Sequence, residues 1–79
     1  MTHVQAMSAV VVAIEDARAR HRSFASWHEA YAVIKEELEE FWDSVKVDRP
    51  DDEELFQVAA CAILAVVELS GTSGELPLA

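Results

Sequence analysis

Apolar residues recur at steps of three and four positions along most of this chain, which is the period of an α-helix with one apolar face. In the first segment the stripe consists of Val4, Met7, Val11 and Ile14, and we expect it to be buried. Arginines gather where this segment ends, and the negative end of a helix dipole favours positive charge there. The pattern therefore predicts a helix over residues 2–21.

The most regular pattern covers residues 26–47, where we predict a second helix. Its apolar positions follow a four-three spacing, which is typical of the seam between helices in a bundle or coiled coil. They are Trp27, Tyr31, Ile34, Leu38, Phe41 and Val45. Ser26 and Glu29 stand three residues apart in capping-box form at its start. We expect Trp27 and Tyr31 in the core, and Trp42, at the edge of the seam, in a subunit interface.

A third helix is predicted over residues 51–70, after a turn at residues 48–52. Pro50 suits the first turn of a helix, and the acidic residues after it favour the positive end of the helix dipole. From Leu55 to Val67 the segment is apolar almost all round, with Gln57 as its one polar exception. Such a helix is covered on several sides, which two helices of the same chain can hardly do. We therefore expect an all-α, three-helix subunit that assembles into an oligomeric helical bundle, as a homodimer or homotetramer.

Length and composition agree with one small helical domain at residues 1–70. A chain of 79 residues buries little apolar surface by itself and often gains stability by association, yet 52% of these residues are apolar. Gly71 is a common signal for the end of a helix, and we expect residues 71–79 to form a flexible tail.

The charge balance limits the class of partner. The formal net charge is −9, from 15 acidic and 6 basic residues, which argues against a nucleic-acid backbone and suits a cation or an anion bridged by one. Solubility alone also explains this charge. The single cysteine, Cys61, allows no disulfide and no zinc site, and we expect a buried, inert thiol. The apolar patch over residues 9–14 is too short to span a membrane, so we expect a cytoplasmic protein with no membrane partner.

Acidic residues are dense on the second predicted helix, and a helical wheel separates them into two groups. Glu36, Glu39 and Asp43 lie opposite the seam and are expected to be solvated. Glu37 lies beside the seam and Glu40 one step farther round. Because these two residues are three apart, their carboxylates are neighbours that repel each other unless a proton or a cation lies between them. Mg²⁺ takes oxygen ligands of this kind, although an ordinary solvated helix face carries the same pair.

The third predicted helix repeats this spacing with Glu54 and Gln57, which both offer oxygen atoms. The short turn implies antiparallel packing. The start of this helix then meets the end of the preceding one, so that Glu54 can face Glu40. The alternative is that Glu54 only favours the helix dipole and that Gln57 is a hydrogen-bonded core amide.

The stretches HEAYAVIKEELEEFWDSV and ELFQVAACAILAVVEL contain an ExxE pair and a second pair that begins after a gap of 13 residues. In this they resemble the MazG-like group of all-α nucleoside triphosphate pyrophosphatases, in its short bacterial and phage form. The resemblance covers about residues 26–69. It implies homodimers or homotetramers whose acids bind Mg²⁺ or Mn²⁺. It also implies hydrolysis of a nucleoside triphosphate to monophosphate and pyrophosphate, as housecleaning of the nucleotide pool.

The family's site residues carry over by position. The ExxE pair falls on Glu37 and Glu40, which are then catalytic as well as metal-binding, and the first acid of the family's ExxD pair falls on Glu54. Gln57 stands where the family has Asp and would offer the metal an uncharged amide oxygen. Bound Mg²⁺ would neutralise phosphate charge and activate a water molecule, whose proton a carboxylate would take.

Three hypotheses for the function follow. The first is this hydrolase, with phosphate contacts from Lys35, Lys46 or the arginines at residues 18–22, for which surface charge is the stronger explanation. The second is a non-catalytic MazG-like relative that binds a nucleotide or serves as an oligomeric interaction module, because Gln57 replaces the family's Asp. The third is an acidic helical adaptor that binds a partner helix in its groove and does not respond to Mg²⁺.

Overall fold

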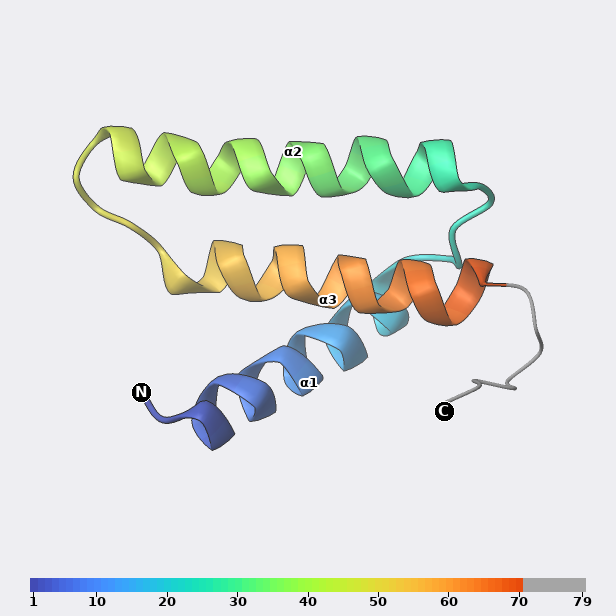
Figure 1. Cartoon of the computed structure of the whole chain (residues 1–79), viewed down its shortest axis with the longest axis horizontal. Helices are drawn as coiled ribbons and strands as arrows, with labels where there is room; N and C mark the ends of the chain where they lie inside the picture. The colour runs from blue at the N-terminus through green and yellow to red at the C-terminus, as the bar shows by residue number, and fades with distance from the viewer. Residues whose placement is uncertain (71–79) are drawn as a thin grey trace.

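The computed structural model describes residues 1–70, which form three α-helices and no strand: α1 (His3–Arg20), α2 (Trp27–Lys46) and α3 (Asp52–Leu69) (Figure 1). The all-α prediction is confirmed for these residues, and each helix begins one residue later and ends one residue earlier than predicted. The stop predicted at Gly71 and the tail predicted at residues 71–79 lie outside the described residues. None of the three helices has the length and apolar character that crossing a membrane requires.

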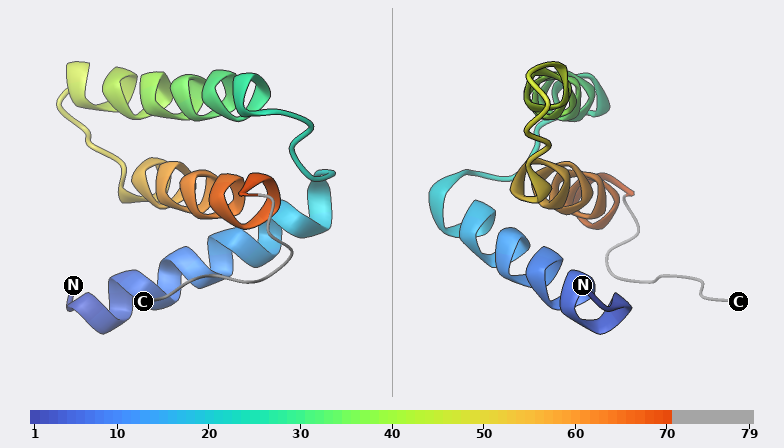
Figure 2. Two further views of the ribbon diagram at one scale, coloured as in Figure 1. Left: turned by 45° about the vertical axis from the view of Figure 1, so that its right-hand side comes forward. Right: turned by 90° about the vertical axis from the view of Figure 1, so that its left-hand side faces the viewer.

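The central helix of the subunit is α3. Antiparallel to it, α2 packs on one side, and α1 crosses it on the other side (Figure 1 and Figure 2). Within residues 1–70, α1 and α2 do not pack against each other, so α3 provides the surface that both share. The α2–α3 turn passes through Asp48, whose φ of 59° lies in the left-handed region that Asp tolerates. This turn brings the start of α3 back to the end of α2.

Side chains cap the first and third helices at their N-termini. The Thr2 hydroxyl oxygen accepts from the Gln5 backbone N–H at 3.1 Å, and the Gln5 side chain accepts from the Thr2 N–H at 2.8 Å. The Asp51 carboxylate caps α3 by accepting from the Glu53 N–H at 3.0 Å. Because Asp51 takes the capping position, Pro50 precedes the helix, and the prediction that it lies in the first turn is wrong.

Ser26 caps α2 as predicted, with its hydroxyl oxygen 3.1 Å from the Glu29 backbone nitrogen. Glu29 also reaches back toward the start of the helix, but it does not complete the expected capping box. Its carboxylate accepts from the Ala25 N–H at 2.7 Å and from two guanidinium nitrogens of Arg22. Glu29 therefore fixes the loop between α1 and α2 in addition to the first turn of α2.

Small side chains make up most of the core. The buried residues are Ala13, Ala17, Ala30, Ala60, Cys61, Leu64 and Ala65. Small side chains let helix backbones approach closely, and Ala60 on α3 has 0% of its surface exposed. No large side chain among the described residues is fully buried. The burial predicted for Cys61 is confirmed.

The apolar stripe of α1 is largely exposed, and the prediction that it is buried is wrong for this subunit. Val4 is 72% exposed and Met7 is 68% exposed. The reason is that α1 directs the small residues Ala13 and Ala17 toward α3, and its N-terminal half diverges from α3 (Figure 1 and Figure 2).

The seam of α2 is also exposed in part. Trp27 is 54% exposed and Tyr31 is 67% exposed, so the prediction that both lie in the core is wrong for the subunit. The face that α2 presents to α3 is displaced from the seam toward Ala30, which is buried, and Val33, which is partly buried. With only two helices against it, α3 also keeps large apolar side chains exposed. They are Leu55, Ile63, Val66 and Val67.

We expect Ala60→Leu to destabilise the subunit by about 1–3 kcal/mol, because added methylene groups at a fully enclosed position force the helices apart. Chemical denaturation followed by circular dichroism measures this free energy of unfolding. Ala62→Leu is the matched control, because Ala62 is exposed on the same helix, and it should change the free energy by less than about 0.5 kcal/mol. Equal effects of the two substitutions would contradict the core described above.

Candidate metal centre

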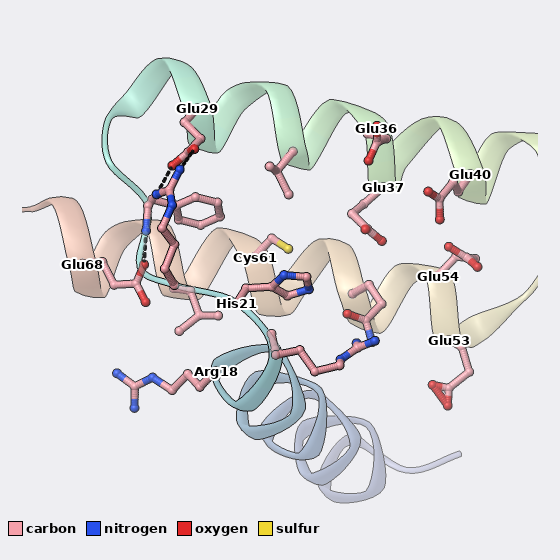
Figure 3. A pocket seen from close by; sticks show the side chains of 17 residues that line it. Arg18, His21, Glu29, Glu36, Glu37, Glu40, Glu53, Glu54, Cys61 and Glu68 are labelled. Carbon is pink, nitrogen blue, oxygen red and sulfur yellow. Dashed lines mark hydrogen bonds and ion pairs between the residues drawn. The ribbon is translucent and has the colours of Figure 1, made fainter.

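Three carboxylates from two helices converge where the end of α2 meets the start of α3. Glu37 and Glu40 come from α2, and Glu54 comes from the first turn of α3 (Figure 3). One oxygen atom of each carboxylate lies within 4.8 Å of one oxygen atom of the other two. The structure thus brings together the three acids that the sequence singled out, although Glu54 follows Glu40 after a gap of 13 residues.

Glu37 lies on the face of α2 that packs against α3. Ala30, Val33 and Glu37 follow one another at helical spacing, and each is buried or partly buried. Glu40 is exposed and Glu54 is partly buried, so the cluster runs from the helix contact outward to solvent. A carboxylate at Glu37 is therefore built into the helix packing and is not part of an ordinary solvated face.

The electrostatic environment raises the pKa of two of these carboxyls. Burial, followed by the charges of Glu40 and Glu36, raises the pKa of Glu37, whereas nearby Arg20 and His21 act in the opposite direction. Burial and then the neighbouring Glu40 raise the pKa of Glu54. Two unit charges about 5 Å apart repel by roughly 1 kcal/mol in water and by more in a less polar environment. The fold thus holds negative charges together and neutralises them only in part.

The acids line a pocket with a volume of about 620 Å³, a size typical of small-molecule sites. Gln57 lines it one turn after Glu54, and Cys61 lines it one turn farther along α3. The Gln57 side chain makes no hydrogen bond within residues 1–70, so the alternative of a hydrogen-bonded core amide is not supported. Burial and the charge of Glu37 raise the pKa of the Cys61 thiol, which keeps it protonated and unreactive.

The remaining charged residues of α2 separate as the helical wheel predicted. Glu36, Glu39 and Asp43 are exposed. Glu36 still lines the pocket, near Glu37 (Figure 3), which the wheel alone did not indicate. Lys35 pairs with Glu39 at 3.0 Å and Lys46 pairs with Asp43 at 3.1 Å, and neither lysine lines the pocket. These lysines are therefore surface charges.

The wall opposite the acids is basic. It is formed by four residues from the end of α1 and the loop that follows, Arg18, Arg20, His21 and Arg22. From the sequence, the arginines at residues 18–22 were possible phosphate contacts, with surface charge and the helix dipole as the stronger explanation, and His21 had no role. The density of basic residues at the end of α1 was the available signal, but only the three-dimensional arrangement shows that these residues meet the acids.

The donor set of the cluster fits a hard divalent cation. Carboxylate and amide oxygens are the ligands that Mg²⁺ prefers, and Mn²⁺ takes the same kind. Oxygen ligands around an octahedral Mg²⁺ lie about 3 to 4 Å apart, and the acid oxygens lie within 4.8 Å of one another. Glu37, Glu40 and Glu54 would hold the ion, and Gln57 lies one turn from Glu54 as an uncharged oxygen donor.

Compared with known protein families, with curated proteins and with solved structures, the chain gives no match in any of the three comparisons. The function is therefore inferred from the residues of the pocket themselves.

At neutral pH and without divalent cations, we expect Glu54→Gln to raise the free energy of unfolding by about 1 kcal/mol, because it removes one repelling charge from the cluster. The pKa of the Glu54 carboxyl is raised in the folded state, so its protonation stabilises the folded protein. This stabilisation is complete below the ordinary carboxyl pKa of 4.5 and is lost as the pH rises through the raised value. The difference between Glu54→Gln and the original protein should therefore vanish as the pH falls to about 4.5.

Glu53→Gln is the matched control for Glu54→Gln, because Glu53 lies in the same first turn of α3 but outside the cluster. Both substitutions remove the same favourable interaction with the helix dipole. Thermal or chemical denaturation in EDTA across this pH range measures the effect. Equal or lower stability of Glu54→Gln relative to Glu53→Gln at neutral pH would show that the carboxylates do not repel each other in the folded protein.

Proposed function

We propose that this protein is a Mg²⁺-dependent nucleoside triphosphate pyrophosphohydrolase that acts on the cytoplasmic nucleotide pool. It would cleave the bond between the α- and β-phosphates with one water molecule and release a nucleoside monophosphate and pyrophosphate. The observation that carries the proposal is the convergence of Glu37, Glu40 and Glu54 from two helices to within 4.8 Å. The MazG-like arrangement of these acids in the sequence supports the same reaction.

In this proposal the pocket residues have two roles, binding of the divalent cation and transfer of a proton from water. Glu37, Glu40 and Glu54 would hold Mg²⁺ or Mn²⁺, with the amide oxygen of Gln57 as a further donor. The bound ion would neutralise phosphate charge and make water more acidic. A carboxylate of the cluster would take the proton that this water molecule loses. Glu37 and Glu40 are therefore the proposed catalytic pair, because they combine ion binding with proton transfer.

We expect pyrophosphate release from a panel of ribo- and deoxyribonucleoside triphosphates to depend on Mg²⁺ or Mn²⁺. Glu37→Gln should lower this rate on the order of 100-fold or more, because it removes both a charged ligand and a proton acceptor. A coupled assay of released pyrophosphate gives the rate. Glu39→Gln, an exposed acid on the other face of α2, should leave the rate unchanged.

If the protein binds Mg²⁺ but releases no pyrophosphate from any nucleotide, the proposed hydrolase activity is wrong and a second candidate function is favoured. That candidate is a non-catalytic MazG-like module that binds a nucleotide, and it is favoured by Gln57, whose amide leaves the cluster with three carboxylates. Gln57→Asp tests its role by calorimetry, since an added charge should tighten Mg²⁺ binding. An unchanged affinity would remove Gln57 from the site.

We also propose that the subunit assembles with copies of itself, as a dimer or tetramer, through the exposed seam of α2. Trp27, Tyr31 and Trp42 are each more than half exposed, at 54%, 67% and 55%. Large apolar side chains that cluster on one exposed face are typical of an interface between subunits. An adaptor that offers this face to another protein's helix would have the same exposed seam but would not form a homo-oligomer.

We expect sedimentation to show a dimer or a larger species, and Leu38→Glu should shift it toward the monomer. Leu38 is 49% exposed in the seam, and a buried unpaired charge opposes association. Ala32→Glu is the matched control, because it adds the same charge to α2 at an exposed position on the opposite side from the seam. A monomeric original protein would contradict self-association and leave the adaptor as the explanation of the seam.

A further inference from the structure

The pocket has two walls of opposite charge. Glu37, Glu40 and Glu54 line one wall. Arg18, Arg20, His21 and Arg22 from α1 and its loop line the other, where Glu29 pairs with Arg22 and Glu68 accepts from the Phe24 N–H (Figure 3). A bare cation would be attracted by the first wall and repelled by the second, and a bare phosphate chain would experience the reverse. A phosphate chain that carries a divalent cation satisfies both walls at once.

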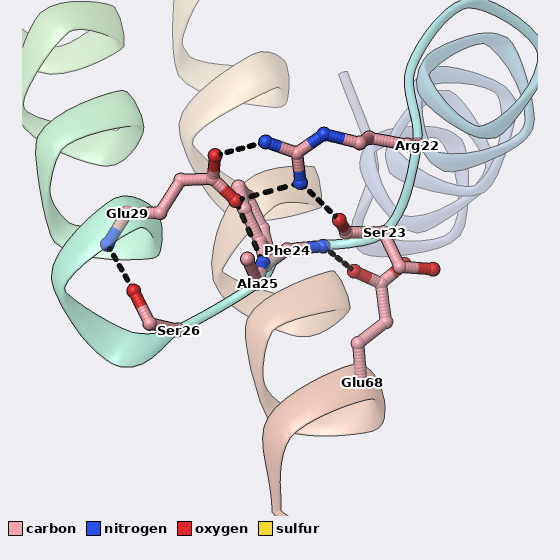
Figure 4. Close-up of polar contacts among 7 residues, drawn as sticks. All are labelled: Arg22, Ser23, Phe24, Ala25, Ser26, Glu29 and Glu68. Carbon is pink, nitrogen blue, oxygen red and sulfur yellow. Dashed lines mark hydrogen bonds and ion pairs between the residues drawn. The ribbon is translucent and has the colours of Figure 1, made fainter.

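Hydrogen bonds hold Arg22 and the loop that follows it in place (Figure 4). Arg22 donates to both carboxylate oxygens of Glu29, at 2.6 and 3.1 Å, and one of these oxygens also accepts from the Ala25 N–H. The Phe24 N–H donates to the Glu68 carboxylate near the end of α3, at 2.8 Å. The loop is thus tied to both α2 and α3, and the guanidinium of Arg22 is already occupied.

Arg20 and His21 are the basic residues best placed to receive a ligand beside the acids. Their charges act on Glu37 and lower its pKa against the effect of burial. Arg20 uses one nitrogen to pair with Asp16 at 2.7 Å, and a guanidinium has four further N–H donors by the usual count of about five. The His21 imidazole makes no hydrogen bond within the described residues and lines the same pocket as the acids (Figure 3). Arg18 points away from the acid cluster (Figure 3).

We propose that Arg20 and His21 bind the phosphate oxygens of a di- or triphosphate whose divalent cation is held by Glu37, Glu40 and Glu54. The inference rests on the proposed function, because it needs the cation at the acids, and it adds the residues that select a phosphate chain. It also makes binding of cation and phosphate mutually dependent. By linkage, each tightens the binding of the other by the same factor.

Calorimetry with the full chain, Mg²⁺ and imidodiphosphate, a pyrophosphate analogue that resists hydrolysis, tests the assignment. At saturating Mg²⁺, Arg20→Gln should weaken imidodiphosphate binding about 10-fold or more, and His21→Gln should weaken it several-fold, because each loses a donor to a charged oxygen. Neither substitution should weaken the binding of Mg²⁺ alone. In EDTA, imidodiphosphate should bind the original protein far more weakly than with Mg²⁺.

Arg49→Gln is the matched control, since it removes the same charge from an exposed residue outside the pocket and should leave imidodiphosphate affinity unchanged. Circular dichroism checks that every variant is folded. If Arg20→Gln binds Mg²⁺ normally and also binds imidodiphosphate as tightly as the unsubstituted protein, this inference is wrong, while the proposed metal centre remains supported. Arg20 would then only offset the negative charge of the acids. Failure of the original protein to bind Mg²⁺ would overturn the metal centre itself, and with it the phosphate site.

Discussion

A carboxylate in the contact between two helices is the constraint on which the rest of this structure depends. Glu37 lies on the α3-facing side of α2, where Ala30 and Val33 are buried or partly buried, and Glu40 and Glu54 stand within 4.8 Å of it. Helix contacts usually exclude such groups, because burial without a partner disfavours the charged form. Here the cost is limited by the open end of the cluster at Glu40 and by the nearby charges of Arg20 and His21. What remains is a cluster of negative charge that a bound cation would stabilise.

The position of Glu37 also explains why the apolar seam of α2 is exposed. When α2 directs Ala30 and Glu37 toward α3, the helical period leaves Trp27, Tyr31 and Leu38 to one side, about half exposed or more. The proposed metal centre and the proposed interface are therefore two consequences of one orientation of α2. A rotation that buried the seam against α3 would carry Glu37 away from Glu54 and separate the cluster.

Local patterns in the sequence predict the elements well, because helix bounds depend on neighbouring residues. The cap at Ser26 and the three-residue spacing of Glu37 and Glu40 are of this kind. Burial was predicted poorly, because an apolar stripe has the same pattern whether its partner belongs to the same chain or to another. Which of the candidate basic residues lie beside the acids could not be predicted, because that depends on contacts between distant residues, such as the hydrogen bond from Phe24 to Glu68.

The charges around Gln57 explain why an uncharged amide is suited to this position. The acid cluster already holds three carboxylates, and burial, followed by the neighbouring negative charges, raises the pKa of Glu37 and Glu54. A fourth carboxylate one turn from Glu54 would add repulsion that a single divalent cation could not balance, so it would favour a second ion. The amide supplies an oxygen without that charge, and the basic wall supplies positive charge across the pocket. The balance of charges therefore suits one divalent ion bound together with a phosphate chain.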